Sequence, residues 1–500
     1  MRFLETNIFQ EWLVITVIFI ALMFLRRHKI KEQFQTGIPP QVDNLLILAI
    51  LLVILNLRAN PTGDEPHYLL ITQSLLRDGD FDLRNNYEQM DYLEYYPTTI
   101  PDPHVTIVGD RWLPVHEIGL PIIMVPFFAL GGRTGVVIML VLMTVIGIRS
   151  LWFFVRSAGF GLRAAGFATL VSGFTLPLIS LSGQVFPEVP AFLLVTLGLQ
   201  TIIGTVLTGR NFVIFLISLV FLPWLHPKYM IVAFALLLSA VLIHHKSATR
   251  SLVIASGLFI ASVLGLVLLT YQWYGVPLPG APIMMAQAPF GEDWLAPLLG
   301  NFFVKPWVGL TGVLLDQQSG LFMATPVFIL AIPGLVSLWY QKRKLAIVCA
   351  IIFASVYLPV GIFGVWYGGF SSPARLLTPA VPILALGIAN MLDVREQRVW
   401  KFFSILALPS LLHAYLMMTL PSFTRYGDPT SQHNYFISLF EHLTHLDLTI
   451  LFPTFRNIDP TTWLTTGIYL SAILAITIFL VPPKVAEHRN KTQHSSQVIL

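Results

Sequence analysis

The sequence predicts an all-α, polytopic integral membrane protein, on three observations. Of its 500 residues, 55% are hydrophobic and only 11% are charged, with a mean hydropathy of +0.73. In soluble domains roughly a quarter of the residues are charged. Apolar runs of about 17–25 residues, long enough to cross a ~30 Å hydrocarbon core as helices, recur along nearly the whole chain. Backbone groups cannot stay unpaired in lipid, so helices rather than open sheets must form these runs.

About 13 spanning helices are predicted from these runs. We expect them near residues 10–25, 43–57, 135–155, 164–182, 189–207, 211–223, 229–243, 251–271, 321–340, 345–365, 376–392, 401–420 and 463–482. The first run lacks a small-residue cleavage site and precedes a basic stretch, so it is interpreted as a retained helix. The apolar segment 117–132 is short and contains two prolines. It is therefore expected to be interfacial or re-entrant on the outer side.

The basic residues predict the orientation of the chain. If the linker 26–42 is cytoplasmic, that side holds 19 of the 30 Lys and Arg residues, in short segments. This agrees with the positive-inside rule, which explains the basic balance without a nucleic-acid partner. The long loops 58–116, 272–320 and 421–462 then face outward. The expected location is the inner or plasma membrane, with any active site on the extracytoplasmic face.

Three segments are expected along the chain. Residues 1–42 form an additional N-terminal transmembrane helix with a basic cytoplasmic linker. Residues 43–392 form the main transmembrane core, and residues 393–500 form C-terminal helices, an outer loop and a cytoplasmic tail. The sequence contains no P-loop, so an activated donor would have to arrive through the membrane.

Asp64 and Glu65, in NPTGDEPHYLL, directly follow an apolar run. Acids near membrane depth are functional candidates, and one of two neighbouring carboxylates can act as a general base toward a hydroxyl. The alternative is a helix N-cap, for which Asp before Glu-Pro is well suited. The apolar spacing that follows predicts a helix lying on the membrane interface.

Further charged residues lie at the mouths of predicted helices. Glu188, in GQVFPEVPAFLL, has almost no loop around it and is either a functional acid or a boundary acid beside two prolines. His226 and Lys228 in LPWLHPKYM, with Arg375 in VWYGGFSSPARLLTP, could hold a phosphate. From the residues alone, interfacial anchoring by snorkelling cations is the simpler interpretation of these basic groups.

Two polar clusters in later loops are weaker candidates. Asp316 and Gln317 precede a predicted span, which suggests either contacts to a sugar or a helix cap. Glu441, His442 and His445 only loosely resemble a metal cluster, and a solvated histidine pair is expected there instead.

Five short motifs lie one after another along the chain, all on the predicted outer side. They are TGDEPHY, PEVPA, WLHPKY, LLDQQSGL and WYGGFSSPARLL. Together they resemble, in islands between about residues 43 and 392, the GT-C superfamily of polytopic glycosyltransferases that use lipid-phosphate sugars. The likeness is greatest to the branch similar to glycosyltransferase family 39, which contains protein mannosyltransferases and bacterial aminoarabinose transferases.

The resemblance implies an inverting transfer of a sugar from a polyprenyl-phosphate donor to an acceptor hydroxyl. It implies catalytic roles for Asp64, as base, Glu65 and Glu188, and substrate-binding roles for His67, His226, Lys228, Asp316, Gln317 and Arg375. No cofactor or metal is required by the implied chemistry, because a lipid phosphate is a good leaving group. The chain lacks the large soluble domains of some relatives, which leaves a lipid, a glycan or a protein open as acceptor.

A lipid-linked-saccharide flippase or another polytopic transporter is the main alternative. Transporters place ionisable groups near the membrane midplane, often in two related halves. In this sequence the acids are expected at helix mouths on one side, which favours the enzyme. A non-enzymatic scaffold would tolerate Asp64→Asn without loss of function.

Overall fold

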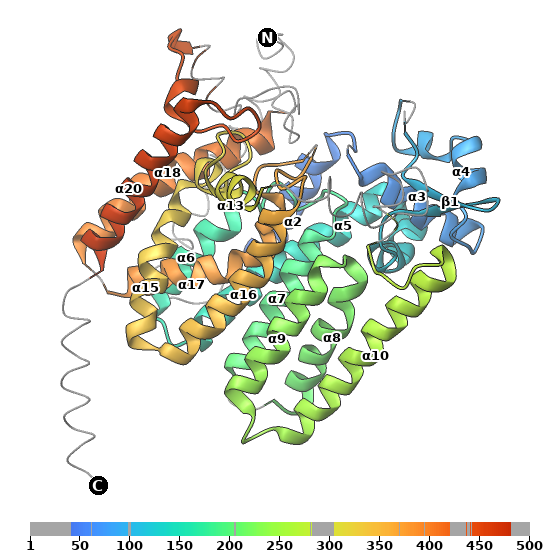
Figure 1. Ribbon diagram of the computed structural model, residues 1–500, viewed down its shortest axis with the longest axis horizontal. Helices are drawn as coiled ribbons and strands as arrows, with labels where there is room; N and C mark the ends of the chain where they lie inside the picture. Colours follow the sequence, from blue (N-terminus) through green and yellow to red (C-terminus); the bar gives the residue numbers. More distant parts are fainter. Residues whose placement is uncertain are drawn as a thin grey trace.

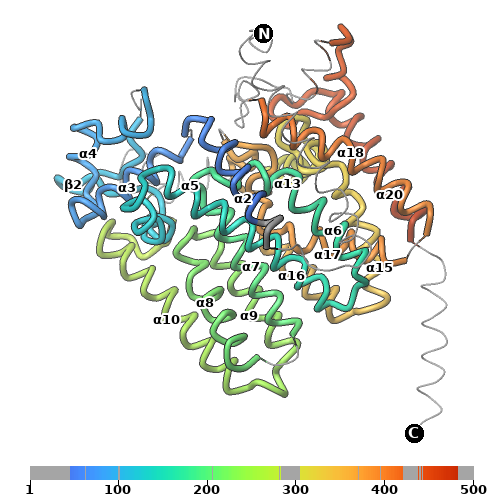
Figure 2. The backbone as a smooth tube through the Cα atoms, turned by 180° about the vertical axis from the view of Figure 1, so that it is seen from behind, coloured from blue at the N-terminus to red at the C-terminus, as the bar shows by residue number. Residues whose placement is uncertain are grey.

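The fold is a bundle of helices with a small polar region at one end. The computed structural model describes residues 42–61, 63–98, 102–204, 207–280, 282, 305–369, 371–394, 396–420, 437, 441 and 443–481. Figure 1 shows the region that contains α3, α4 and β1 next to one end of α8 and α10, with α15 to α17 on the other side of the bundle. Seen from behind in Figure 2, α2 lies near α5, with which it is in contact.

The bounds of the described elements follow the chain. They are α2 (Val42–Leu57), α3 (Glu65–Arg77), α4 (Arg84–Glu88), η2 (Asp91–Glu94), β1 (Val105–Val108), β2 (Arg111–Pro114), α5 (Gly119–Ser157), α6 (Leu162–Phe174), α7 (Glu188–Ile203), α8 (Gly209–Leu225), α9 (Lys228–His244), α10 (Thr249–Tyr274), α13 (Pro306–Leu315), α14 (Leu321–Ala324), η3 (Pro326–Leu330), α15 (Ala331–Gln341), α16 (Arg343–Ile362), η4 (Arg375–Ala380), α17 (Val381–Asp393), α18 (Gln397–Thr419), η5 (Thr449–Leu451) and α20 (Pro460–Leu480).

The predicted class, an all-α polytopic membrane protein, is confirmed. Among the described residues, 6 helices are long and apolar enough to cross a membrane, and further apolar helices have 10–17 residues. The total of about 13 spans stays a prediction, because the first predicted span, 10–25, lies outside the described residues. The strands β1 and β2 form an antiparallel hairpin in the loop before α5.

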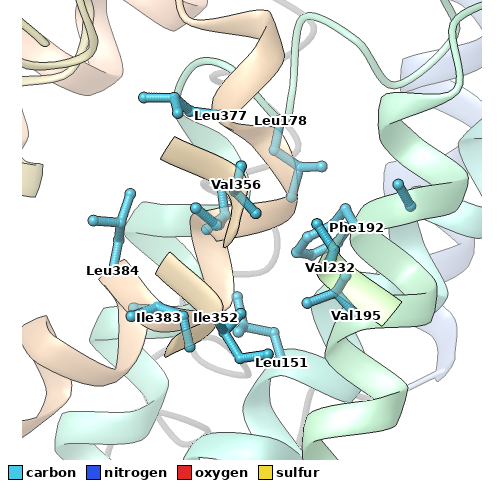
Figure 3. Close-up of a cluster of buried hydrophobic side chains, with 14 of the residues drawn as sticks. Leu151, Leu178, Phe192, Val195, Val232, Ile352, Val356, Leu377, Ile383 and Leu384 are labelled. Atoms are coloured by element: carbon cyan, nitrogen blue, oxygen red, sulfur yellow. The ribbon is translucent and has the colours of Figure 1, made fainter. Parts of the chain in front are cut away.

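The centre of the bundle is apolar and closely packed. Figure 3 shows Leu151 of α5, Phe192 of α7 and Val232 of α9 with side chains from α16 and α17. Small residues permit close approach of helices in such bundles. A Cβ on Gly334 of α15 would meet the backbone of Gly387 in α17, so these two helices pack at backbone distance.

The segment 117–132 was predicted to be an interfacial or re-entrant element separate from the span that follows. Its helical part begins α5 at Gly119 and is separated from the rest of α5 by a kink at Gly131 and Gly132, where the backbone is not helical. The position of this first part at a membrane interface stays a prediction. Gly132 has φ 54°, a backbone conformation that other residues adopt rarely. The sequence places two flexible residues at this point, so one long apolar helix is divided into an outer and an inner part.

Two predicted spans are interrupted by prolines. The span 164–182 ends at Phe174, because Thr175 is extended and Pro177 follows within two residues. The span 321–340 breaks at Thr325, directly before Pro326, into α14, η3 and α15. In both places hydropathy indicated a continuous helix, and the proline determined where it ends.

Helix α3 is present where the sequence predicted a helix, but its surroundings differ. Residues 65–74 are buried on all sides, so the helix does not lie on the surface of the protein with one face open.

Helix α13, within the predicted loop 272–320, was not expected. Of the loosely metal-like group in the last loop, His442 lies outside the described residues.

Candidate active site

Residues from four separated parts of the chain meet at one end of the bundle. They come from the start of α3, the start of α7, the turn between α8 and α9, and the start of η4. Asp64 lies 3.6 Å from Arg375, and Glu188 lies 3.0 Å from Lys228. The sequence analysis selected these four residues but did not predict the two ion pairs that they form.

Asp64 occupies the N-cap position of α3, yet its side chain makes no capping hydrogen bond in the described structure. The carboxylate instead lies between Arg375 Nη1 at 3.6 Å and His104 Nδ1 at 3.8 Å, with 32% of the side chain exposed. Burial alone would raise the pKa of Asp64. Its attraction to His116 and His104, which are protonated only at the acidic pH where Asp64 titrates, and to the permanently charged Arg375 lowers the pKa overall. The carboxylate is therefore ionised at neutral pH and partly open to solvent.

Glu65 points away from its neighbour. Its Oε2 accepts a hydrogen bond of 2.9 Å from the backbone N–H of Val185, and the residue is 2% exposed. This bond ties the irregular segment between α6 and α7 to the start of α3. The geometry favours a positioning role for Glu65 over contact with an acceptor, so the two adjacent acids do different work.

Glu188 and Lys228 form a buried ion pair. Glu188 is the first residue of α7 and Lys228 the first of α9. Their side chains are only 2% and 17% exposed, so neither extends to the surface as an interfacial anchor would. Lys228 also lies over the ring of Tyr229, with Nζ 5.0 Å from the centroid.

Arg375 is held by a glycine-containing turn. Its Nη2 donates a hydrogen bond of 2.9 Å to the carbonyl of Gly368, which has φ 87°. Its guanidinium carbon lies 4.1 Å from the centre of the Phe186 ring, and 11% of its side chain is exposed. The WYGG turn and the aromatic face therefore fix the guanidinium beside Asp64, with one edge still open to a ligand.

Two histidines that the sequence analysis missed complete the surroundings of Asp64. His104 and His116 flank the β1–β2 hairpin, and His104 Nδ1 lies 2.9 Å from His116 Nε2. The ring of His67 stacks on that of His104, with 3.6 Å between the ring centroids, and its Nδ1 lies 2.6 Å from the Tyr87 hydroxyl. His67 therefore packs against the histidine pair and holds His104 in place. The only available signal was a histidine at each end of the hairpin sequence in the same loop.

The histidines are neutral at neutral pH. Burial lowers the pKa of His116 to about 4 and lowers that of His104 as well. Ligand atoms of Asp64, His104 and His116 all lie within 4.8 Å of one another. Two imidazoles and a carboxylate are a donor set that suits zinc or another first-row divalent ion. These residues therefore fit a cation, and independence from metal stays a prediction.

Asp316 fits the cap interpretation. Its Oδ1 accepts hydrogen bonds from the backbone and side chain of Ser319, and its Oδ2 accepts one of 3.0 Å from the Phe455 N–H. The adjacent Gln317 donates its N–H to the Pro453 carbonyl at 2.9 Å. Both residues thus join the segment before α14 to the segment before α20.

His226 has a similar local role. Its Nδ1 accepts a hydrogen bond of 3.3 Å from the backbone N–H of Lys228, at the beginning of α9. This contact fixes the turn from which Lys228 reaches Glu188. A role for His226 in contacting a substrate stays a prediction.

No family model matches the sequence, and no curated protein matches it. Solved structures similar to this chain include ArnT from Cupriavidus metallidurans in the apo state, at 14% identity and a TM-score of 0.48, with 89% of this chain and 73% of that chain covered. ArnT bound to undecaprenyl phosphate gives 14% and 0.49, with coverage of 89% and 77%.

An oligosaccharyltransferase from Archaeoglobus fulgidus in the apo form is also similar, at 13% identity and a TM-score of 0.42. The match covers 81% of this chain and 59% of that one.

Proposed function

We propose that the protein is an inverting membrane glycosyltransferase that transfers a sugar from a polyprenyl phosphate to an acceptor hydroxyl at the extracytoplasmic face. The observation that carries this proposal is the convergence of Asp64, Arg375 and the Glu188–Lys228 pair at one end of the bundle. The five motifs that supply these residues support it, because they resemble those of enzymes that use such donors.

In the proposed reaction, the acceptor hydroxyl donates its proton to Asp64 while its oxygen attacks the anomeric carbon. The bond from that carbon to the phosphate oxygen breaks, and polyprenyl phosphate leaves with the electron pair. Asp64 releases the proton to solvent, because its pKa is lowered and its side chain is 32% exposed. The step inverts the configuration at the anomeric carbon.

Lys228 and Arg375 would stabilise the charge that develops on the leaving phosphate. Fixed cations in a poorly hydrated site lower the barrier of such a step effectively. Arg375 offers a planar fork whose position is already set by Gly368 and Phe186. Glu65 would keep the segment that contains Phe186 in place through its bond to Val185.

The test is release of polyprenyl phosphate by the purified protein in lipid vesicles supplied with polyprenyl-phosphate sugars and an acceptor mixture. Wild type should release it, and Asp64→Asn should reduce kcat by about 100-fold or more, because general-base catalysis contributes on that order. Equal release by both proteins would contradict the role of Asp64. The same assay with a metal chelator added should give an unchanged rate of polyprenyl phosphate release if no metal participates.

The sidedness is tested separately. Met90 in the first loop is 45% exposed, whereas the native Cys349 is 1% exposed. Met90→Cys in intact cells should therefore react with a membrane-impermeant thiol reagent against a low background. Labelling only after permeabilisation would place the site on the cytoplasmic side and contradict the proposed orientation.

A further inference from the structure

Three buried polar atoms next to the Glu188–Lys228 pair have no hydrogen-bond partner in the part of the chain that the structure describes. They are Glu188 Oε2, the Tyr229 hydroxyl and Arg375 Nε. Buried polar groups in folded proteins are nearly always hydrogen-bonded. A group of such atoms in one place therefore indicates that another molecule supplies their partners.

Lys228 connects the first two of these atoms in space. Its Nζ lies 3.0 Å from Glu188 Oε1, and also 5.0 Å from the centre of the Tyr229 ring. Glu188 is 1% exposed and Tyr229 is also 1% exposed. The carboxylate that carries the unpaired oxygen and the ring that carries the unpaired hydroxyl thus both lie close to the ammonium group of Lys228, in a buried region.

Arg375 extends this region toward Asp64. The elements that supply these groups are in contact, because α7, which begins at Glu188, packs against both η4, which begins at Arg375, and α9, which contains Tyr229. Arg375 also contacts Asp64 through Nη1 at 3.6 Å. The unpaired atoms therefore belong to one member of each ion pair and to Tyr229 beside Lys228, and they include a pure acceptor, a pure donor and a hydroxyl that can be either.

We propose that these three groups bind the sugar ring of the donor, with Glu188 Oε2 accepting a hydrogen bond from one of its hydroxyls. This inference rests on the proposed function and adds to it the chemical class of the sugar. A ligand with several hydroxyls supplies both donors and acceptors, as this set requires. A uronic acid would bring a second carboxylate next to Glu188, and the site should reject it.

The assignment gives Lys228 and Glu188 distinct tasks. Glu188 has two oxygens, one occupied by Lys228 and one available to a sugar hydroxyl. The lipid phosphate binds Lys228 and the Nη atoms of Arg375. Recognition of the sugar depends on Glu188 and Tyr229, together with Arg375 Nε. Phosphate binding and sugar selection can therefore be separated by experiment.

The main variant is Tyr229→Phe, which removes only the hydroxyl. Because that hydroxyl has no protein partner among the described residues, the variant should be as thermostable as wild type. The matched control is Tyr357→Phe, whose hydroxyl, unlike that of Tyr229, has a protein partner: it donates to the Leu310 carbonyl at 2.8 Å. The control should lose thermostability and keep wild-type donor selectivity, the reverse of the expected behaviour of Tyr229→Phe.

The measurement is kcat/KM for polyprenyl phosphates carrying glucose, mannose or glucuronic acid, with thermal shifts produced by each donor and by polyprenyl phosphate alone. For the neutral sugar that wild type uses best, Tyr229→Phe and Glu188→Gln should lower kcat/KM by about 10-fold or more, as loss of a specific hydrogen bond does. The shift from polyprenyl phosphate alone should not change in Tyr229→Phe.

Two results would overturn the inference while leaving the proposed function intact. One is wild-type kcat/KM in Tyr229→Phe with every donor that wild type uses. The other is wild-type use of the glucuronic acid donor as efficiently as the best neutral donor. Failure of wild type to release polyprenyl phosphate from any donor would instead contradict the proposed function itself.

Discussion

The two ion pairs of the site differ in the regions that contain them. Asp64 and Arg375 are 3.6 Å apart in the polar region around α3 and the hairpin, and Asp64 is 32% exposed. Glu188 and Lys228 are 3.0 Å apart at the ends of α7 and α9, with side-chain exposures of 2% and 17%. The first pair is loose and reachable, whereas the second is tight and enclosed.

This difference indicates which of the two ion pairs can exchange its ionic partner more easily. A partly exposed ion pair contributes little to stability, so its members can change partners at small cost. A buried pair is different, because removing one member leaves an uncompensated charge in a poorly polarisable environment. Asp64 is thus placed to exchange ligands during turnover. The Glu188–Lys228 pair keeps a fixed geometry, in which the proposed reaction uses Lys228 for the phosphate and Glu188 for a sugar hydroxyl.

The largest expected effect comes from breaking the buried pair. Lys228→Met should lower the free energy of unfolding by about 3–5 kcal/mol, because Glu188 then keeps its charge without a counter-ion. Thermal unfolding of the protein in nanodiscs measures this loss. The double variant Lys228→Met with Glu188→Gln should recover much of it, and a double variant as unstable as the single one would contradict the assignment.

A third acid sharpens the comparison, since Glu117 has no counter-ion among the described residues. Burial raises its pKa from 4.5 to about 8. A carboxyl whose pKa is raised by folding costs stability as the pH rises above its unfolded value. Glu117→Gln should therefore stabilise the protein by about 3 kcal/mol at pH 7 and by less than about 1 kcal/mol at pH 5.

The pH series of thermal unfolding, for wild type and Glu117→Gln in parallel, checks this prediction. A stabilisation that is constant from pH 5 to pH 8 would show that the effect comes from packing and not from the charge. The Glu117→Gln substitution leaves the Asp64–Arg375 contact in place. Activity of this variant at pH 7 therefore serves as a control for correct folding.

A smaller effect is expected in the support of the histidine cluster. The Tyr87 hydroxyl contacts His67 Nδ1 at 2.6 Å and accepts from the His104 N–H at 3.2 Å. Tyr87→Phe removes both contacts from a buried place and should cost about 1–2 kcal/mol. Hydrogen exchange should increase around residues 104–116 and stay unchanged in α7 and α9; an increase in both regions would mean that they unfold together.

The smallest effect on stability should come from Asp64→Asn. Because the pair with Arg375 is loose and partly exposed, the free energy of unfolding should change by less than about 1 kcal/mol. Equilibrium unfolding of the two proteins measures this difference. A loss comparable to that of Lys228→Met would show that Asp64 is structural, and would weaken the catalytic interpretation.

Much of the fold was predictable because a membrane imposes simple rules on composition. Hydropathy correctly indicated the class and most described helices, such as α10 and α16. It could not locate the ends of α6 or α15, because a proline next to an extended residue changes the backbone without changing the hydropathy. The break at Gly131 and Gly132 falls where the prediction divided the segment 117–132 from the span 135–155.

The site was predictable where motifs supplied charged residues at helix ends. Asp64, Glu188, Lys228 and Arg375 were selected on that basis, and the structure brings them together. The histidine cluster was not predictable in this way. His104 and His116 meet Asp64 only because the hairpin folds back over α3, and no local pattern records a contact between distant segments.

The break in α5 has a mechanical consequence. Gly131 and Gly132 separate an outer arm from the part of the helix inside the bundle, and a Cβ on Gly119 in that arm would meet the backbone of Trp224 at the end of α8. The arm therefore packs closely against α8 at Gly119 and ends at the kink formed by Gly131 and Gly132. A side chain at position 119 would therefore displace the arm from α8, at a point between the hairpin that precedes the arm and the turn that precedes Lys228.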